Sequence, residues 1–232
     1  MNLRINKNIQ DGNTLDETIG RNEAALTEKG FPAENRTTLQ NNISDLTTKE
    51  GIQNKREKML EDLTAEQDSC ISDTQTLIKK VRTAASSAYV NDARTLKIFN
   101  VGINKRVPKS VNGLRSECAY LSPVVAARIA DLLKSGLQQA DITALNEAPD
   151  KLINADKKQE DAKKQRSQAT IERDDAAKEL KKTKTKIRNF VKTAFAGNAA
   201  MLVQFEPISM GKGGGGSDDA GGDTPPENPP AK

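Results

Sequence analysis

Apolar residues recur at alternating intervals of three and four along much of the chain, which is the spacing of one face of an α-helix. The longest such stretch covers residues 150–195 and contains no Gly or Pro. Alanine returns to its apolar face every seventh residue, at Ala155, Ala162, Ala169 and Ala176. Because small side chains let a second helix approach closely, this stretch predicts a helix of roughly 65–70 Å with a long packing seam.

A comparable apolar stretch runs from about residue 37 to residue 87. In both stretches a strongly polar zone interrupts the apolar face, at residues 47–58 and at residues 157–168. Each zone is either the solvated middle of a continuous helix or the turn of a helical hairpin. Gly51 permits a break in the first zone, but nothing in the second encodes a turn, so two continuous helices are the favoured interpretation.

A shorter helix is predicted before each long one. Thr14 and Glu17 form a capping-box pattern that predicts a helix start at Thr14, and the Lys-Gly-Phe-Pro run at 29–32 predicts its end. In the second half of the chain, Ser122 followed by Pro123 has the pattern of an N-cap and the first helical position. These patterns predict matching short helices from Thr14 and from Ser122.

The sequence also repeats. Residues 81–84 (Val-Arg-Thr-Ala) match residues 191–194 (Val-Lys-Thr-Ala) at an offset of 110, and residues 92–99 match residues 198–205 at an offset of 106. The second block predicts a short closing helix in each copy, near 92–100 and 198–205, with N-caps at Asp92 and Asn198. At the offset of 110, the seam positions Leu63, Cys70, Leu77 and Ala84 align with Arg173, Leu180, Ile187 and Ala194.

These patterns predict an all-α fold: an elongated antiparallel helical bundle built from two tandem pseudo-symmetric helical units. We expect unit 1 at residues 1–101, an ordered connector at 102–121, unit 2 at 122–210 and a disordered Gly-, Pro- and Asp-rich tail at 211–232. The residues expected to pack in the helix seam are Leu63, Cys70, Leu77, Ala84, Ala162, Ala169, Ala176, Leu180, Ile187 and Phe190.

Composition agrees with a thin bundle, since only 3% of the residues are aromatic, 29% are charged and the mean hydropathy is −0.69. No stretch approaches the roughly 20 apolar residues that span a bilayer, and the first residues lack a signal-peptide core. We therefore expect no membrane partner and, by default, a cytoplasmic location. Export by a route that needs no signal peptide remains an alternative. Cys70 and Cys118 are expected to be free thiols.

The chain contains no histidine, which excludes His-based acid–base catalysis, Ser-His and Cys-His nucleophiles and most zinc sites. The acidic clusters at 160–161 and 172–175 lack the spacing of a calcium-binding loop. In a phosphate-binding loop the lysine follows the glycines, but Lys212 comes before the glycine run, so no phosphate loop is predicted there. We therefore predict no catalytic residue, no cofactor and no metal. The expected function is a non-enzymatic structural or interaction module that associates with itself or is a subunit of a larger assembly.

A basic run near the end of the second long helix is the strongest candidate for a different function. Clustered positive charge attracts phosphate backbones, so the alternative hypothesis is a nucleic-acid-binding accessory protein. The run lacks aromatic residues for base stacking, however, and its charges point in several directions, so a solvated helix surface is the favoured interpretation. Its members are Lys178, Lys181, Lys182, Lys184, Lys186, Arg188 and Lys192.

Two arginines, Arg166 and Arg173, fall on the predicted seam of the second long helix. Arginines in such positions either hold a carboxylate of a partner or pair with an acid on the neighbouring helix of the same bundle. We expect the second of these arrangements.

Overall fold

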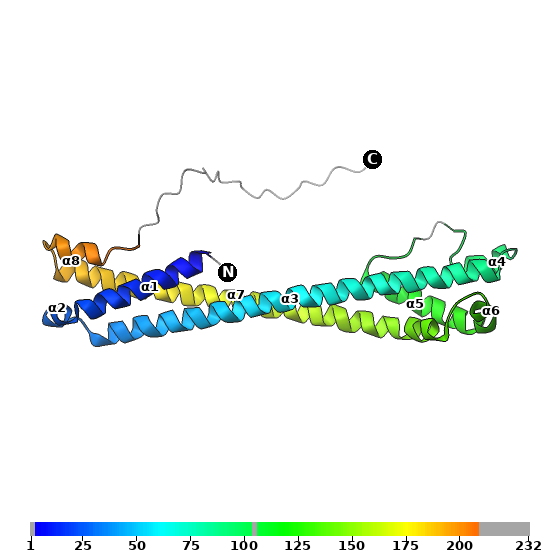
Figure 1. Cartoon of the computed structure of the whole chain (residues 1–232), viewed down its shortest axis with the longest axis horizontal. Coiled ribbons are helices and arrows are strands. Elements are labelled where there is room, and N and C mark those ends of the chain that lie inside the picture. The colour runs from blue at the N-terminus through cyan, green and yellow to red at the C-terminus, as the bar shows by residue number, and fades with distance from the viewer. Residues whose placement is uncertain (1–2, 104–105, 209–232) are drawn as a thin grey trace, which may run out of the picture.

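The computed structural model describes residues 3–103 and 106–208, and within them it contains eight α-helices and no strand (Figure 1). The predicted all-α fold is confirmed. The helices are α1 (Leu3–Arg21), α2 (Glu23–Glu28), α3 (Ala33–Ala88), α4 (Ala93–Ile98), α5 (Val111–Ala126), α6 (Ile129–Lys134), α7 (Gln139–Ala194) and α8 (Ala199–Gln204).

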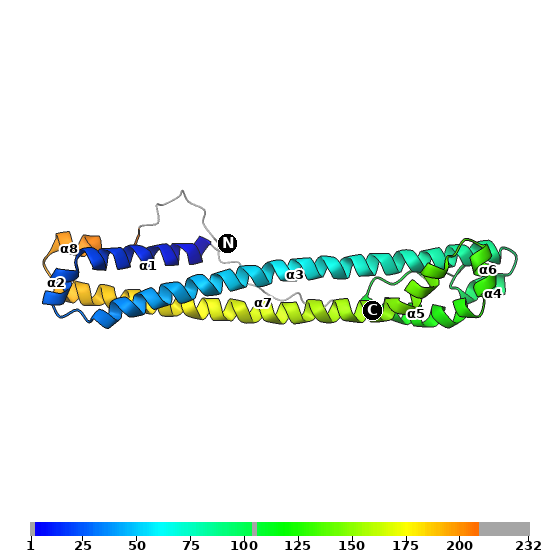
Figure 2. The ribbon, with the colours of Figure 1, turned by 60° about the horizontal axis from the view of Figure 1, so that its bottom comes forward.

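Two helices run the full length of the molecule. The helices α3 and α7 have 56 residues each, pack against one another and point in opposite directions (Figures 1 and 2). At ~1.5 Å per residue each is about 84 Å long. Both polar zones, 47–58 and 157–168, lie inside these helices, so the continuous-helix prediction is confirmed and the hairpin alternative is wrong. Gly51 is an interior residue of α3.

The remaining helices gather at the two ends of this pair (Figure 2). At one end, α1, α2 and α8 lie beside the start of α3 and the end of α7, and we call this the α1 end. At the other end, α4, α5 and α6 lie beside the end of α3 and the start of α7, and we call this the α5 end. Between the two ends, α3 and α7 lie side by side without a third helix from residues 3–103 and 106–208 (Figures 1 and 2). We define the waist as residues 53–67 of α3 and 156–170 of α7 in this middle section.

Each end has its own hydrophobic core. At the α1 end the helix α1 contributes Leu15 and Ile19, which pack against Leu39 of α3 and Ile187 of α7. At the α5 end the buried residues of α5 pack in the same way between α3 and α7, and they are Leu114, Cys118, Leu121 and Val125. The waist instead buries the polar residues Gln53, Gln67 and Gln159 beside alanines of α7. Apolar burial is therefore concentrated at the ends.

The residues predicted for the helix seam differ in burial. Six of the predicted residues are buried: Ala84, Ala162, Ala169, Ala176, Leu180 and Ile187. The other four, Leu63, Cys70, Leu77 and Phe190, are half-buried. Phe190 packs edge-on against Phe31, with ring centroids 5.2 Å apart.

The start predicted for the first short helix is wrong. The helix α1 begins at Leu3 and passes through Thr14 without interruption, and the hydroxyl of Thr18 donates a hydrogen bond of 2.8 Å to the carbonyl of Thr14. The reason is tertiary packing: Ile5 and Ile9 extend the apolar face of the helix and join the core of the α1 end. Burial of this face outweighs the capping pattern, which is a local signal.

The start predicted for the second short helix is also wrong. The helix α5 begins at Val111, and its N-cap is Ser110, whose hydroxyl accepts a hydrogen bond from the Gly113 amide at 3.2 Å. Pro123 lies inside this helix, near its end. The predicted connector at 102–121 is therefore largely helical, because residues 111–121 belong to α5.

The second long helix begins earlier than predicted, at Gln139 instead of about residue 150. Gln138 and Asp141 form the capping box at its start, with the Asp141 carboxylate accepting from the Gln138 amide at 2.8 Å. Pro149 is accommodated in the interior of α7. The helix continues through it because Leu145 and Leu152, on either side, are fully buried in the core.

Other boundaries agree with the sequence. Asp92 caps α4 by accepting from the Thr95 amide at 3.0 Å, and Asn198 caps α8 by accepting from the Met201 amide at 3.1 Å. Gly30, with φ of 77°, takes the left-handed conformation that ends α2, as the Lys-Gly-Phe-Pro run predicts. Residues 209–232 lie outside the described residues, and with them the predicted tail.

Candidate interaction sites

The basic run of α7 does not form one surface. Lys178 and Lys182 are exposed, and each pairs with an acid one turn earlier on the same helix: Lys178 with Asp175 at 2.8 Å, and Lys182 with Glu179 at 2.6 Å. Such local pairs are typical of a solvated helix surface.

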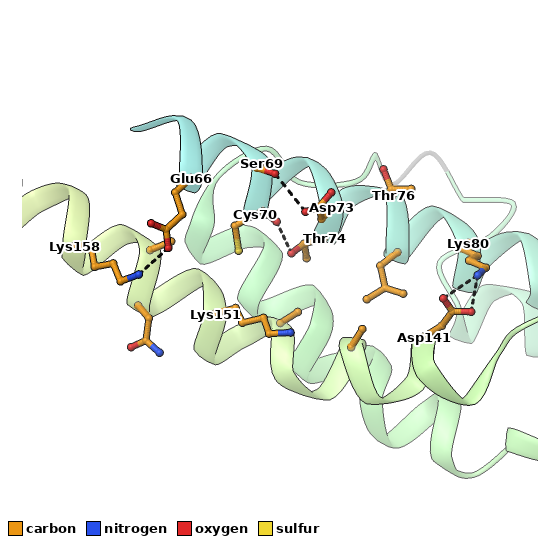
Figure 3. A pocket seen from close by; sticks show the side chains of 15 residues that line it. Glu66, Ser69, Cys70, Asp73, Thr74, Thr76, Lys80, Asp141, Lys151 and Lys158 are labelled. Carbon is orange, nitrogen blue, oxygen red and sulfur yellow. Dashed lines mark hydrogen bonds and ion pairs between the residues drawn. The ribbon is translucent and has the colours of Figure 1, made fainter. Parts of the chain in front are cut away.

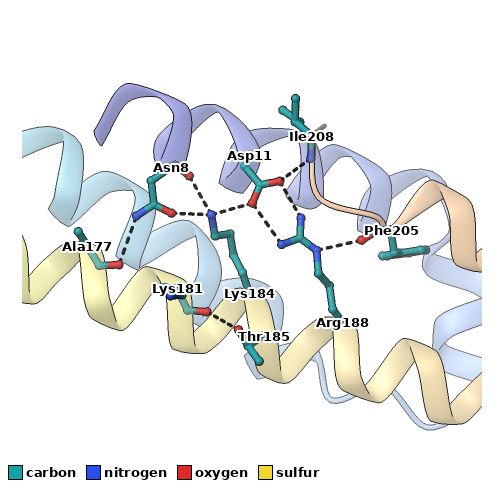
Figure 4. A network of polar contacts seen from close by, with 9 residues as sticks. All are labelled: Asn8, Asp11, Ala177, Lys181, Lys184, Thr185, Arg188, Phe205 and Ile208. Atoms are coloured by element: carbon teal, nitrogen blue, oxygen red, sulfur yellow. Dashed lines mark hydrogen bonds and ion pairs between the residues drawn. The ribbon is translucent and has the colours of Figure 1, made fainter. Parts of the chain in front are cut away.

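Two other members of the run, Lys184 and Arg188, point toward α1 and form a partly buried network with Asp11 (Figure 4). The Lys184 ammonium lies 2.7 Å from the Asp11 carboxylate, and it also donates to the backbone carbonyl and the side-chain oxygen of Asn8. The Arg188 guanidinium lies 2.7 Å from the other Asp11 oxygen and donates through Nε to the Phe205 carbonyl at 2.9 Å. The Ile208 amide also donates to Asp11, at 3.1 Å. The network therefore ties α1, α7 and the segment after α8 together.

Burial and charge have opposing effects on this network. Burial by itself raises the pKa of Asp11, but the hydrogen bonds from Arg188, Lys184 and the Ile208 amide outweigh it and lower that pKa to about 2. Burial lowers the pKa of Lys184, and the nearby charges of Arg188 and Lys181 lower it further, although Asp11 opposes both effects. Asp11 is thus held firmly as an anion, while Lys184 is a cation in an unfavourable environment.

A surface hollow of about 380 Å³ lies over this network. Besides the network residues, its lining includes Lys181, Lys192, Asn189 and Pro207. Lys181 and Lys192 have no carboxylate within ion-pair distance in the part of the chain that the structure describes. The hollow is therefore lined by four cationic side chains of α7 and one carboxylate. Lys186, the last member of the run, is exposed and does not line it.

The α5 end contains a simpler version of the same contact. Arg82 of α3 lies 2.7 Å from Glu117 of α5; the Glu117 side chain is buried and the Arg82 side chain is partly buried. The side-chain amide of Asn100, which has a φ of 58°, donates to the same carboxylate at 2.8 Å. In both ends, then, an arginine near the end of a long helix binds a carboxylate in the middle of a short one.

A longer groove of about 870 Å³ lies between α3 and α7 near the α5 end (Figure 3). Ion pairs close both of its ends: Glu66 with Lys158 at 2.7 Å, and Lys80 with Asp141 at 2.6 Å. Between these pairs the lining is mostly small or apolar, and it includes Cys70, Thr74, Leu77, Ala144, Ala148 and Ala155. The groove exists because alanines face it from α7.

The groove has little chemistry to offer. Its one thiol, Cys70, has a raised pKa because burial and the neighbouring Asp73 disfavour the thiolate. The second cysteine, Cys118, is buried in the core of the α5 end, where burial raises its pKa to about 11. Both cysteines are free, as predicted, and neither has the lowered pKa of a nucleophile.

The arginines of the α7 seam pair with acids of α3, as expected. Arg166 lies 3.4 Å from Glu57, and Arg173 lies 3.7 Å from Glu50 and 2.7 Å from Asp174. Arg173 and Glu50 are both buried at the margin of the waist. These pairs fix the register of α3 against α7 where apolar contacts are few.

Two absences concern the described residues only. Residues 3–103 and 106–208 contain no group of three or more acidic or cysteine side chains placed to hold a metal ion. Nor do they include a helix with the length and apolar character that crossing a membrane requires.

Sequence reasoning singled out Lys184 and Arg188 but missed their partners Asn8 and Asp11, together with the Arg82–Glu117 pair. The signal was present, because Asp11 lies four residues before Leu15 and Glu117 lies four residues before Leu121, on the same helical faces. Comparisons with known protein families, with curated proteins and with solved structures found no match.

Proposed function

We propose that this protein is a non-enzymatic rod that holds two interaction ends at a fixed separation, either in an assembly of its own copies or as a subunit of a larger one. The observation that carries the proposal is the α3–α7 pair: two uninterrupted helices of 56 residues each, with additional helices only at the two ends. A pair of this length is mechanically suited to spacing, since neither helix has a break at which the rod could fold.

We also propose that the rod arose by duplication of one helical unit. The helices α2, α3 and α4 begin at residues 23, 33 and 93, and α6, α7 and α8 begin at 129, 139 and 199, which is 106 residues later each time. Several buried or special residues are identical at this spacing: Leu26 and Leu132, Gly30 and Gly136, Leu39 and Leu145, Arg82 and Arg188, and Phe99 and Phe205. The sequence repeat near residues 81–84 and 191–194 has an offset of 110, which differs from 106 by about one helical turn. Both offsets therefore align residues on the same face of α3 and α7.

A duplicated rod presents two related but different ends, which is useful to a protein that joins two partners. The ends differ in charge, because the α1 end has a cation-lined hollow and the α5 end has a groove closed by ion pairs. The absence of histidine from the chain and the raised pKa values of both cysteines favour a binding role over a catalytic one.

The association state is the first test. We expect light scattering coupled to size-exclusion chromatography to find an assembly of several chains, or affinity purification from the source cells to recover a stoichiometric partner. A monomer at every concentration, with no stoichiometric partner recovered, would remove the interaction part of the proposal.

The second test, of the proposed spacer role, shortens the rod without changing the helices at its two ends. Deleting residues 54–60 from α3 together with 163–169 from α7 removes two heptads that face each other across the waist, as the Glu57–Arg166 pair shows. The rod should shorten by about 10 Å with both cores intact. Each end should keep its own partner, while an assembly that engages both ends should be lost. An unchanged assembly would contradict the spacer role, and deletion of 54–60 alone is the control for broken register.

A further inference from the structure

The four cations of the α1-end hollow lie on one face of α7. Lys181, Lys184, Arg188 and Lys192 follow one another at intervals of three, four and four residues, so each is next to the following one on the helix surface. Like charges at these intervals repel one another and destabilise a helix. Within the hollow, only Asp11 offsets this row.

The α5 end shows that the fold itself does not require this row. Three lysines surround Arg188 on α7: Lys181 lies seven residues before it, Lys184 four residues before it and Lys192 four residues after it. Relative to Arg82, which makes the same kind of ion pair, the corresponding residues are Gln75, Ile78 and Ser86. One arginine is therefore sufficient for the contact between a short helix and a long one, and the three lysines are an addition of the α1 end.

The contacts of each cation indicate which of them are available to a ligand. Lys184 is fully occupied, since its ammonium donates to Asp11 and to both oxygens of Asn8. Lys181 and Lys192 line the hollow without an ion-pair partner among the described residues, and Arg188 lies between them along the helix. The side-chain amide of Asn189 adds a neutral donor to the same lining, whereas the Thr185 hydroxyl donates to the Lys181 carbonyl.

We propose that this hollow is a binding site for a linear anion that carries several phosphate groups. Lys181 and Lys192 are eleven residues apart, which places them about 16 Å apart along α7, so a chain of phosphates fits their separation better than a single phosphate does. Lysines bind phosphate as point charges and accept this kind of extended ligand. The lining contains no aromatic residue on which a base could stack, which favours a bare polyphosphate over a nucleic acid.

The test uses the full chain and inorganic tripolyphosphate as the probe, with binding measured by titration calorimetry at low and at physiological salt. We expect binding that weakens as salt rises. The variant K181Q/K192Q should bind at least tenfold more weakly, a loss of roughly 1.4 kcal/mol of binding free energy. Both lysines are exposed and outside the Asp11 network, so this variant should keep the melting temperature of the parent chain.

The matched control is K178Q/K182Q, which removes the same number of charges from the same helix but at positions outside the hollow. It should bind tripolyphosphate as the parent chain does. The proposal is overturned if the control loses as much affinity as K181Q/K192Q, if tripolyphosphate does not bind, or if only a single-stranded oligonucleotide binds. The proposal is independent of the rod function, because the association state and the partners do not enter this measurement.

Discussion

The two ends of the rod have the same architecture but fill one region of their cores differently. At the α5 end, Ile78 and Leu114 are fully buried, and a single arginine, Arg82, binds the carboxylate of the short helix. At the α1 end, the residues 106 positions away from Ile78 and Leu114 are Lys184 and Asn8, and the carboxylate of Asp11 binds two cations. The arginine–carboxylate contact is therefore common to both ends, whereas its surroundings are apolar in one and polar in the other.

This difference separates what the fold needs from what one end has in addition. A buried polar network has to compensate for the loss of hydration of every charge that it contains, and an apolar cluster does not. The α5 end shows that apolar side chains can occupy the neighbouring positions of this contact. Stability alone therefore does not account for Lys184, and the polar region at the α1 end is the better candidate for function.

The largest expected effect comes from removing the arginine at either end. Arg82→Met leaves the buried Glu117 carboxylate without its arginine, and Arg188→Met does the same to the partly buried Asp11 carboxylate. Removing one partner of a buried ion pair costs about 3–5 kcal/mol of unfolding free energy. The loss should be smaller for Arg188→Met than for Arg82→Met, because Asp11 retains the charged Lys184, whereas the Asn100 amide that donates to Glu117 carries no charge. Urea denaturation measures both values.

The control for this comparison removes both partners. At the α5 end, combining Arg82→Met with Glu117→Leu eliminates the uncompensated charge and should restore much of the stability. At the α1 end Asp11 also binds Lys184, so the matching control is the triple variant Asp11→Leu/Lys184→Met/Arg188→Met. If each single variant cost less than about 1 kcal/mol, the two contacts would be ordinary surface pairs and the comparison between the ends would lose its basis.

An intermediate effect is expected from acid, and Asp11 at the α1 end should make a large contribution to it. The pKa of Asp11 is about 2 in the folded protein, against an ordinary value of 3.8, so the carboxylate contributes stability that is fully present above pH 3.8. That contribution is lost as the pH falls from 3.8 toward 2, and it amounts to about 2 kcal/mol. Urea denaturation between pH 5 and pH 2 should show this loss in the parent chain.

Asp11→Asn is the comparison for the acid experiment. It keeps the shape of the side chain but cannot titrate, so its stability should fall less steeply over the same pH interval. A parallel decline in the two proteins would mean that other carboxylates dominate the acid response of the rod.

The sequence predicted the long elements better than the short ones. The α3–α7 pair follows from apolar spacing that continues over many turns on both sides of the polar zones, which a single local signal cannot overturn. The starts of α1 and α5 were missed because Thr14 and Ser122 have local capping patterns, while the actual starts depend on burial against α3 and α7. That error also hid the site: Asp11 lies before Thr14, and Glu117 lies before Ser122, so neither was assigned to a helix that could bring it to an arginine.

The smallest expected effect comes from giving the α1 end the apolar residues of the α5 end. Lys184→Ile alone leaves the Asn8 oxygen without its donor and should cost about 1 kcal/mol. Adding Asn8→Leu removes that oxygen, and burial of two apolar side chains should bring the stability back to that of the parent chain or slightly above it. Arg188 still binds Asp11 in both variants. Urea denaturation of the two single variants and the double variant gives the coupling between the positions, which should be about 0.5–3 kcal/mol. A double variant much less stable than either single one would mean that Lys184 and Asn8 are needed for the α1 end to fold. Recovery would instead mean that the fold accepts either an apolar or a polar pair at these two positions, so that stability does not require Lys184 and Asn8.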